Sequence, residues 1–175
     1  MSEKPNKREK VDNLLSSTVP TDAEEVFSPQ KHLRPRIEFL TEISDAEGDY
    51  CLMRCTLPAG AVVPMHSHSD RETFYVVSGK IDVLREDRWA ELGPGDVVDV
   101  RDGCKHALRN SSPAAASIIC VTTARLTRFL REIAIPANSP SSGDASHFHK
   151  LVRAYGYWLA SPHENAAVGL DVSWT

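Results

Sequence analysis

The sequence predicts an all-β fold, a closed barrel or sandwich of short antiparallel strands. Apolar runs of about four to eight residues, rich in Val, Ile, Phe and Tyr, recur between residues 37 and 123 and are typical of strands. Turn segments containing Gly, Pro or Asp separate them at the short spacing of an antiparallel barrel. No helical pattern alternates with these runs, which disfavours a parallel α/β sheet.

Length and composition set the class of protein. A chain of 175 residues with 41% hydrophobic and 25% charged residues has room for one domain with one core. A net charge of -4 leaves no basic excess for phosphates, so we expect a small-molecule partner and no nucleic acid. No window reaches the run of about 20 apolar residues that spans a bilayer, and the N-terminus lacks a secretory signal. We therefore expect no membrane partner and a cytoplasmic location.

The N-terminal region, residues 1–35, is predicted to be a flexible tail and arm. Residues 1–13 alternate Lys, Arg, Glu and Asp with few apolar residues, so burial cannot repay the entropy of ordering them. Pro20, Pro29 and Pro35 punctuate the following stretch and favour an extended arm over a helix.

Six strands are expected in the central region. They cover residues 37–43, 50–57, 72–77, 80–85, 96–100 and 116–123. Met53 and Arg54 alternate on one strand, so only one of them can face the interior, and the sequence leaves open which. Phe74 and Val76 share a face with Glu72 and are expected to wall the site, whereas Tyr75 points elsewhere.

A helical extension, residues 125–175, is expected after the last strand. Helical spacing of apolar residues predicts a first helix at Leu126, Phe129, Leu130 and Ile133, and a second at Phe148, Leu151, Val152 and Tyr155. Residues 136–143 form a linker, Asp144 or Ser142 could cap the second helix, and Gly156 suits its end. The extension either covers the mouth of the barrel or crosses to a second subunit.

The chemistry concentrates in four side chains. His66 and His68 are two residues apart, so on an extended strand both imidazoles project from one face. A tight turn then starts a strand at Glu72, whose carboxylate can return to the two nitrogens. Two His and one carboxylate form a facial ligand set with open positions. His106, after another strand and a Gly turn, is the expected fourth ligand.

Two segments carrying these residues resemble the paired motifs of the cupin superfamily. The first contains Gly60, His66, His68, Glu72 and Gly79, and the second contains Gly95, Gly103, His106 and Asn110. Arg101 stands where the family usually has Pro, which we expect to alter the loop at the end of the barrel without removing His106 as a ligand. The resemblance extends over residues 36–124. It implies a double-stranded β-helix (jelly-roll) barrel, often dimeric, with a metal near one open end.

Other histidines, cysteines and tryptophans are expected to be structural. His147 and His149 point to different sides of a helix and are interpreted as surface residues, while His32 and His163 have no ligand-like neighbours. The four cysteines form no CxxC pair and should stay reduced, with Cys51 and Cys55 on one buried face. Cys104 either approaches the metal or belongs to the turn before His106. Trp89, Trp158 and Trp174 are expected to pack in the core or an interface, without a basic neighbourhood.

Three functions remain open at this point. The first is a mononuclear dioxygenase-like enzyme acting on a small organic molecule, with His66, His68, Glu72 and His106 as metal ligands and catalytic residues. Fe(II) is the first choice of metal, with Zn, Ni, Mn or Cu as alternatives. The second is a non-enzymatic binding or sensing module, favoured by the lack of an obvious general acid or base. The third is a metal-dependent isomerase or lyase. A barrel that keeps the histidines without metal is the structural alternative, and a homodimer is expected because an open sheet edge needs covering.

Overall fold

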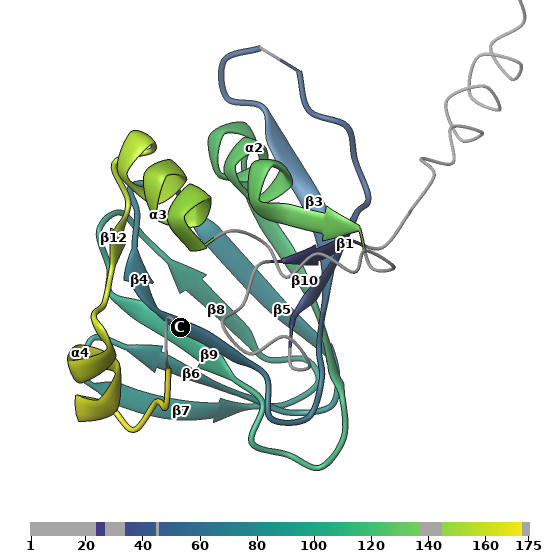
Figure 1. Ribbon diagram of the computed structural model, residues 1–175. Helices are drawn as coiled ribbons and strands as arrows, with labels where there is room; N and C mark the ends of the chain where they lie inside the picture. The colour runs from purple at the N-terminus through teal and green to yellow at the C-terminus, as the bar shows by residue number, and fades with distance from the viewer. Residues whose placement is uncertain (1–23, 27–33, 45, 137–144, 173–175) are drawn as a thin grey trace, which may run out of the picture.

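The chain folds into two antiparallel sheets that face each other and enclose one core (Figure 1). A computed structural model describes residues 24–26, 34–44, 46–136 and 145–172. The seven-stranded sheet has the order β11 (Ala134–Pro136), β1 (Glu24–Val26), β2 (Arg36–Phe39), β3 (Tyr50–Leu57), β10 (Ala116–Thr123), β5 (Glu72–Ser78) and β8 (Val97–Val100). The five-stranded sheet has the order β12 (Trp158–Leu159), β4 (Val62–Ser67), β9 (His106–Arg109), β6 (Ile81–Arg85) and β7 (Arg88–Leu92). The predicted all-β barrel is confirmed.

All six predicted strands are present, with one shortened. The strand expected over residues 37–43 is β2, which ends at Phe39. Beyond it, the hydroxyl of Thr41 accepts a hydrogen bond from the Leu52 amide at 2.9 Å, so a side chain replaces the main-chain ladder there. β7 and β9 were not predicted as strands. Their sequences, RWAEL and HALR, contain no β-branched residue, and they are strands because both pair with β6.

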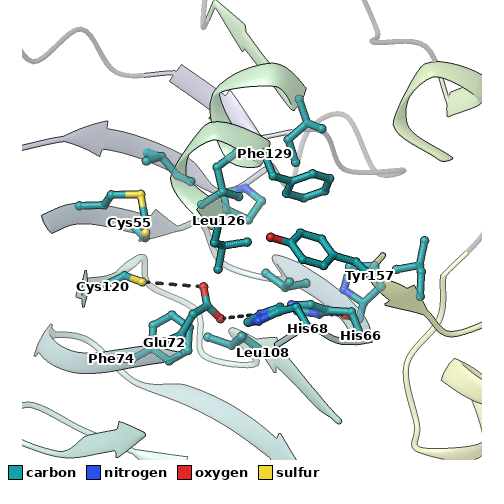
Figure 2. Close-up of a pocket in the computed structure, with 18 of the residues that line it drawn as sticks. Cys55, His66, His68, Glu72, Phe74, Leu108, Cys120, Leu126, Phe129 and Tyr157 are labelled. Carbon is teal, nitrogen blue, oxygen red and sulfur yellow. Dashed lines mark hydrogen bonds and ion pairs between the residues drawn. The ribbon is translucent and has the colours of Figure 1, made fainter. Parts of the chain in front are cut away.

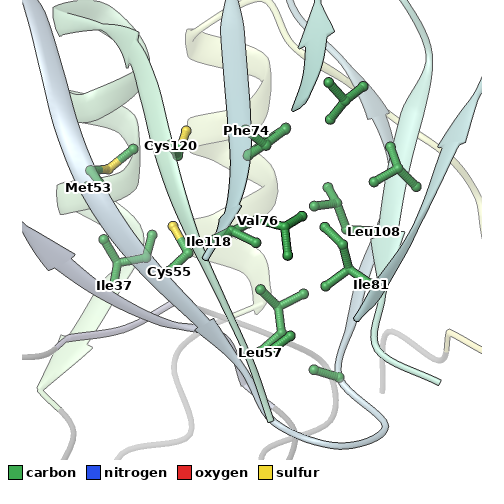
Figure 3. Close-up of a cluster of buried hydrophobic side chains, with 14 of the residues drawn as sticks. Ile37, Met53, Cys55, Leu57, Phe74, Val76, Ile81, Leu108, Ile118 and Cys120 are labelled. Carbon is green, nitrogen blue, oxygen red and sulfur yellow. The ribbon is translucent and has the colours of Figure 1, made fainter. Parts of the chain in front are cut away.

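Alternation along β3 answers the open question of what faces the interior. Cys51, Met53 and Cys55 are buried, whereas Arg54 is exposed and donates to Glu38 at 3.0 Å. The interior is therefore apolar at this strand. Figure 3 shows Met53 and Cys55 among the core side chains between the two sheets.

The C-terminal extension covers one end of the barrel with two helices, α2 (Ala124–Ile133) and α3 (Ala145–Ala154). Both predicted helices are present, and Figure 1 shows them together above the strands. The hydroxyl of Thr123 caps α2 by accepting from the Leu126 amide. Gly156 follows α3 with φ +68°, the left-handed conformation that ends helices. The proposed caps of α3, Ser142 and Asp144, and most of the linker lie outside the described residues.

The chain then returns to the barrel wall. β12 pairs with β4, placing Trp158 opposite Ser67 and Leu159 opposite His66. A last helix, α4 (Pro162–Ala167), is anchored by the buried side chain of Asn165, whose Oδ1 accepts from the Met65 amide at 2.9 Å. The extension thus covers the mouth of its own barrel, one of the two arrangements left open by the sequence.

The expectation that the tryptophans lack basic neighbours is wrong for two of them. The guanidinium of Arg109 lies 4.1 Å from the ring centroid of Trp89, and the ammonium of Lys105 lies 4.3 Å from that of Trp158. Both contacts join residues distant in sequence and have the geometry of cation–π pairs. Trp174 lies outside the described residues. Within the described part of the chain, no helix is long and apolar enough to span a membrane.

Candidate metal centre

Four polar side chains meet inside the barrel, near the end that α2 and α3 cover. His66 lies near the end of β4, His68 just after that strand, Glu72 at the start of β5 and His106 at the start of β9. β4 and β9 pair directly, with His66 opposite His106, while Glu72 comes from the other sheet. The barrel therefore brings together the four residues that the sequence singled out.

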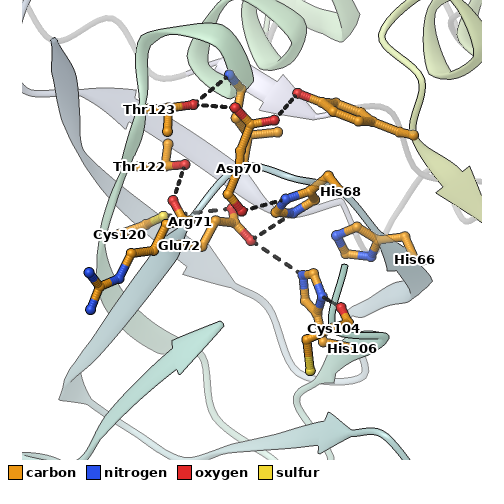
Figure 4. A network of polar contacts seen from close by, with 12 residues as sticks. His66, His68, Asp70, Arg71, Glu72, Cys104, His106, Cys120, Thr122 and Thr123 are labelled. Atoms are coloured by element: carbon orange, nitrogen blue, oxygen red, sulfur yellow. Dashed lines mark hydrogen bonds and ion pairs between the residues drawn. The ribbon is translucent and has the colours of Figure 1, made fainter. Parts of the chain in front are cut away.

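Their separations suit one ion. One potential ligand atom from each of the four residues lies within 4.8 Å of the others. Oε2 of Glu72 lies 3.3 Å from Nε2 of both His68 and His106. An ion about 2.1 Å from each donor holds opposite ligands about 4.2 Å apart, so small side-chain shifts are sufficient to coordinate one. Figure 4 shows the three imidazoles and the carboxylate directed at a common centre.

The main chain fixes the same tautomer for all three imidazoles. Each Nδ1 lies within hydrogen-bond distance of a carbonyl oxygen: His66 of Pro64 at 2.7 Å, His68 of Asp70 at 2.8 Å and His106 of Cys104 at 2.9 Å. Because a carbonyl oxygen only accepts, each Nδ1 carries the proton and each Nε2 presents a lone pair. This arrangement orients metal-binding histidines.

The lone pairs lack partners within the protein. Nε2 of His68 and of His106 are buried without a hydrogen bond, although both lie near a carboxylate oxygen that also only accepts. Buried acceptors facing one another are costly, since each loses hydration and gains nothing. A cation at their centre satisfies all of them at once, so the residues present fit a divalent metal.

Electrostatics favour an ionised carboxylate here. Burial raises the pKa of Glu72, but His106 and His68 outweigh it and hold that pKa well below its usual range. Burial and the neighbouring imidazoles lower the pKa of His66 to about 3. For His68, burial lowers the pKa, but the contact with Glu72 and the hydrogen bond to Asp70 raise it overall. Around neutral pH the site therefore offers a carboxylate and a neutral His66, the forms that bind metal.

The loop before His106 is held without the proline usual in the resembling family. The Gly103 amide donates to the carbonyl of His68 at 2.9 Å, which fixes this loop against the other ligand loop. Arg101 is exposed and donates to Asp99 at 3.0 Å. Cys104 lies outside the ligand cluster, and its Sγ contacts only the Lys105 carbonyl among the described hydrogen bonds. The structure thus favours the turn role for Cys104.

A buried carboxylate beside the cluster was missed from the sequence. Asp70 accepts from the hydroxyl of Thr123 at 2.5 Å, from the guanidinium of Arg125 at 2.8 Å and from the hydroxyl of Tyr157 at 2.6 Å. Its carbonyl also binds His68. Asp70 therefore joins a ligand loop to the start of α2 and to the chain after α3. The only sequence feature that pointed to Asp70 was its charge between His68 and Glu72. Nothing in the sequence pointed to Tyr157, which belongs to no motif.

A cavity of about 150 Å³ opens onto the cluster. Phe74 lines it as expected, Val76 is buried in the core, and Tyr75 is 46% exposed. Figure 2 shows the cavity extending from His66, His68 and Tyr157 toward Cys55 and Cys120. The C-terminal extension contributes part of its lining: Leu126, Phe129, Leu130, Ile133, Phe148, Val152, Tyr157, Trp158 and Leu159.

The remaining histidines take no part in this or another metal cluster of the described residues. His147 and His163 are exposed, and His149 is partly buried on α3. His32 lies outside the described residues.

Comparisons with known proteins support the same fold. Residues 53–122 match the family model described as Cupin domain, and no curated protein matches the sequence. A predicted oxalate decarboxylase from Thermotoga maritima is 19% identical, with a TM-score of 0.50 over 59% of this chain and 93% of that one. A cupin-2 domain from Rhodospirillum rubrum is 14% identical, with a TM-score of 0.47 over 51% of this chain and 60% of that one. The likeness to the Thermotoga maritima structure, at this low identity, shows a shared fold and nothing about substrates.

Proposed function

We propose, on the premise that this chain belongs to the cupin superfamily, that it is a mononuclear metal-dependent enzyme of the dioxygenase type acting on a small organic molecule. The observation that carries the proposal is the convergence of three Nε2 lone pairs and one carboxylate on a single point. In this proposal His66, His68, Glu72 and His106 are the metal ligands and catalytic residues, and the metal is Fe(II).

The ligand set leaves charge and space for a substrate. Three neutral imidazoles and one carboxylate leave a single positive charge on a divalent ion. When bound, that ion supplies open coordination positions for a substrate oxygen group and for dioxygen. Glu72 and His106 are almost fully buried, so substrates reach the ion from the cavity.

The protein's own residues orient the ligands and exclude water. The carbonyls of Pro64, Asp70 and Cys104 hold the three rings in one orientation, and the apolar lining of the cavity offers few partners for solvent. Excluding water from the site prevents water from competing with dioxygen or from diverting reactive species.

Oxygen uptake tests the proposal. The apoprotein is loaded anaerobically with Fe(II), mixed with enol, diketone or catechol-like substrates, and exposed to oxygen. Uptake that depends on both substrate and Fe(II), and that His106→Ala abolishes, is expected. The dioxygenase proposal fails if no substrate of these classes stimulates uptake with any of the candidate metals.

A second candidate is an oxygen-independent isomerase or lyase, favoured by Tyr157. Its hydroxyl lines the cavity and donates to Asp70, and burial together with this hydrogen bond raises its pKa above the usual value. Tyr157 therefore keeps its proton at neutral pH, and in this candidate its hydroxyl turns from Asp70 to give that proton to the substrate. Turnover under anaerobic conditions with Zn(II) or Mn(II), lost in Tyr157→Phe, distinguishes this candidate.

Ligand binding without turnover would instead identify a binding module, and thermal stabilisation by a metabolite measures it. A homodimer and a cytoplasmic location stay predictions. Light scattering, which measures the mass of the protein in solution, tests the first.

A further inference from the structure

The cavity beside the metal-ligand cluster has a lining that selects for apolar ligands. Beyond His66, His68 and Glu72, its walls are aliphatic and aromatic side chains and two buried thiols, and they include no Lys, Arg or Asp of the described residues. The apolar wall inside the barrel includes Ile37, Met53, Leu57, Phe74, Leu108 and Ile118. A phosphorylated or multiply hydroxylated ligand would leave its polar groups without partners here.

The polar groups near the wall are already engaged. The Tyr157 hydroxyl donates to Asp70 at 2.6 Å, and the Cys120 thiol lies 3.9 Å from Oε1 of Glu72. Burial, followed by the charge of Glu72, raises the pKa of Cys55 to about 12, so this thiol stays neutral. Away from the ligand cluster the cavity therefore offers mainly apolar contact surface to a ligand.

The size of the cavity limits what fits. Its volume is about 150 Å³, and an apolar cavity of roughly that volume stays dry and takes up benzene. The cavity also has two chemically distinct ends. His66 and His68 lie at one, and Cys55 lies at the other (Figure 2).

We propose that this cavity is a substrate subsite for a compact apolar group about the size of a benzene ring. The group is carried on an oxygen-bearing head that reaches the metal, and this second part rests on the proposed function. The substrate class is thus a small amphipathic molecule with one chelating end. Leu126 and Phe129 of α2 also line the cavity, so the C-terminal extension takes part in selecting the ligand.

Two hydroxamates with the same head test the subsite. Benzohydroxamate and acetohydroxamate are titrated into the metal-loaded protein by calorimetry. Burial of the ring is expected to make benzohydroxamate bind about 10- to 100-fold more tightly. Affinities within about threefold of each other would overturn the subsite.

A probe that lacks the metal-chelating group tests the subsite separately from the proposed function. Fluorobenzene is added to the metal-free, full-length protein and followed by ¹⁹F NMR. Saturable binding is expected because the apolar lining is independent of the metal. If neither hydroxamate binds the metal-loaded protein but fluorobenzene binds the metal-free protein, the metal proposal fails and the subsite stands. Absence of saturable fluorobenzene binding overturns the subsite.

A matched pair of variants on β3 locates the binding. Cys55→Met fills the cavity with a flexible side chain, whereas Arg54→Met changes the neighbouring residue, which is exposed on the outer face. Cys55→Met is expected to reduce the preference for benzohydroxamate by about tenfold while acetohydroxamate binding stays unchanged, and Arg54→Met should behave as wild type. An unchanged preference in a folded Cys55→Met protein would show that the ring binds elsewhere and contradict the proposal.

Discussion

Replacing Asp70 with Asn should weaken the attachment of the C-terminal extension to the barrel. The carboxylate is 5% exposed and accepts hydrogen bonds from Thr123, Arg125 and Tyr157. An amide of the same shape loses the charge and turns an NH₂ group toward one of these donors.

The magnitude follows from the three contacts. Hydrogen bonds to a buried charged group contribute about 1.5 to 3 kcal/mol each, which applies to Thr123 and Tyr157. The side chain of Arg125 is 44% exposed, so its ion pair adds at most about 1 kcal/mol after solvent screening. Because Asn retains one acceptor, the net loss is expected to be about 3 kcal/mol, or a fall in Tm of roughly 6 to 12 °C for a chain of this size.

Urea unfolding of the metal-free protein measures the effect, and Tyr157→Phe is the matched control. Removal of one hydrogen bond should cost about 1.5 kcal/mol, and the double variant should lose less than the sum because both changes break the same contact. Metal content should be retained in Asp70→Asn, since His68 binds the main-chain oxygen of residue 70. A loss below about 1 kcal/mol for Asp70→Asn, or strict additivity, would refute the role assigned to this carboxylate.

Two further predictions concern the barrel itself. Gly79→Ala should destabilise the protein by about 3 kcal/mol, because Gly79 has φ +75° and an added Cβ would lie 2.7 Å from the main chain at residues 115–116. Gly48→Ala is the control, with φ +79° and open space, and should cost only about 1 to 2 kcal/mol in the same urea experiment; equal losses would exclude the clash. A thiol reagent at about pH 8 should modify one cysteine of the native protein, because Cys104 is partly exposed while the other three are buried. Cys104→Ser should remove this reaction. Burial raises the pKa of Cys55 to about 12, so this thiol should stay unreactive when the pH is raised to about 9. A second cysteine that reacts rapidly would show that the other three thiols are not buried.

Six strands and the first part of the candidate metal-ligand cluster were predictable because they depend on short-range patterns. β3 and β10 match their predicted bounds, since each is a short apolar run bounded by turn residues. His66 and His68 could be placed together from their spacing of two residues, and Glu72 from the turn that follows. His106 was placed from its position after a strand and a Gly turn and from the motif resemblance, since its distance from Glu72 depends on how the sheets close.

What the sequence did not reveal depends on packing between distant segments. Tyr157 contacts Asp70 across 87 residues, and neither residue has a spacing that points to the other. The contact between Lys105 and Trp158 likewise requires β12 to pair with β4. β9 carries His106 of the candidate cluster, yet its sequence lacks strand formers, so only its partners in the sheet define it.

Metal analysis of protein purified without an affinity tag tests the central claim most directly. Elemental analysis of the wild-type protein should find one divalent transition metal ion per chain, and His106→Ala, which removes a fully buried ligand, should lose it on dialysis while remaining folded. If the two proteins hold the same amount of metal, or if the wild type retains none after loading with Fe(II), Zn(II) or Mn(II), then the four converging side chains do not form a metal centre.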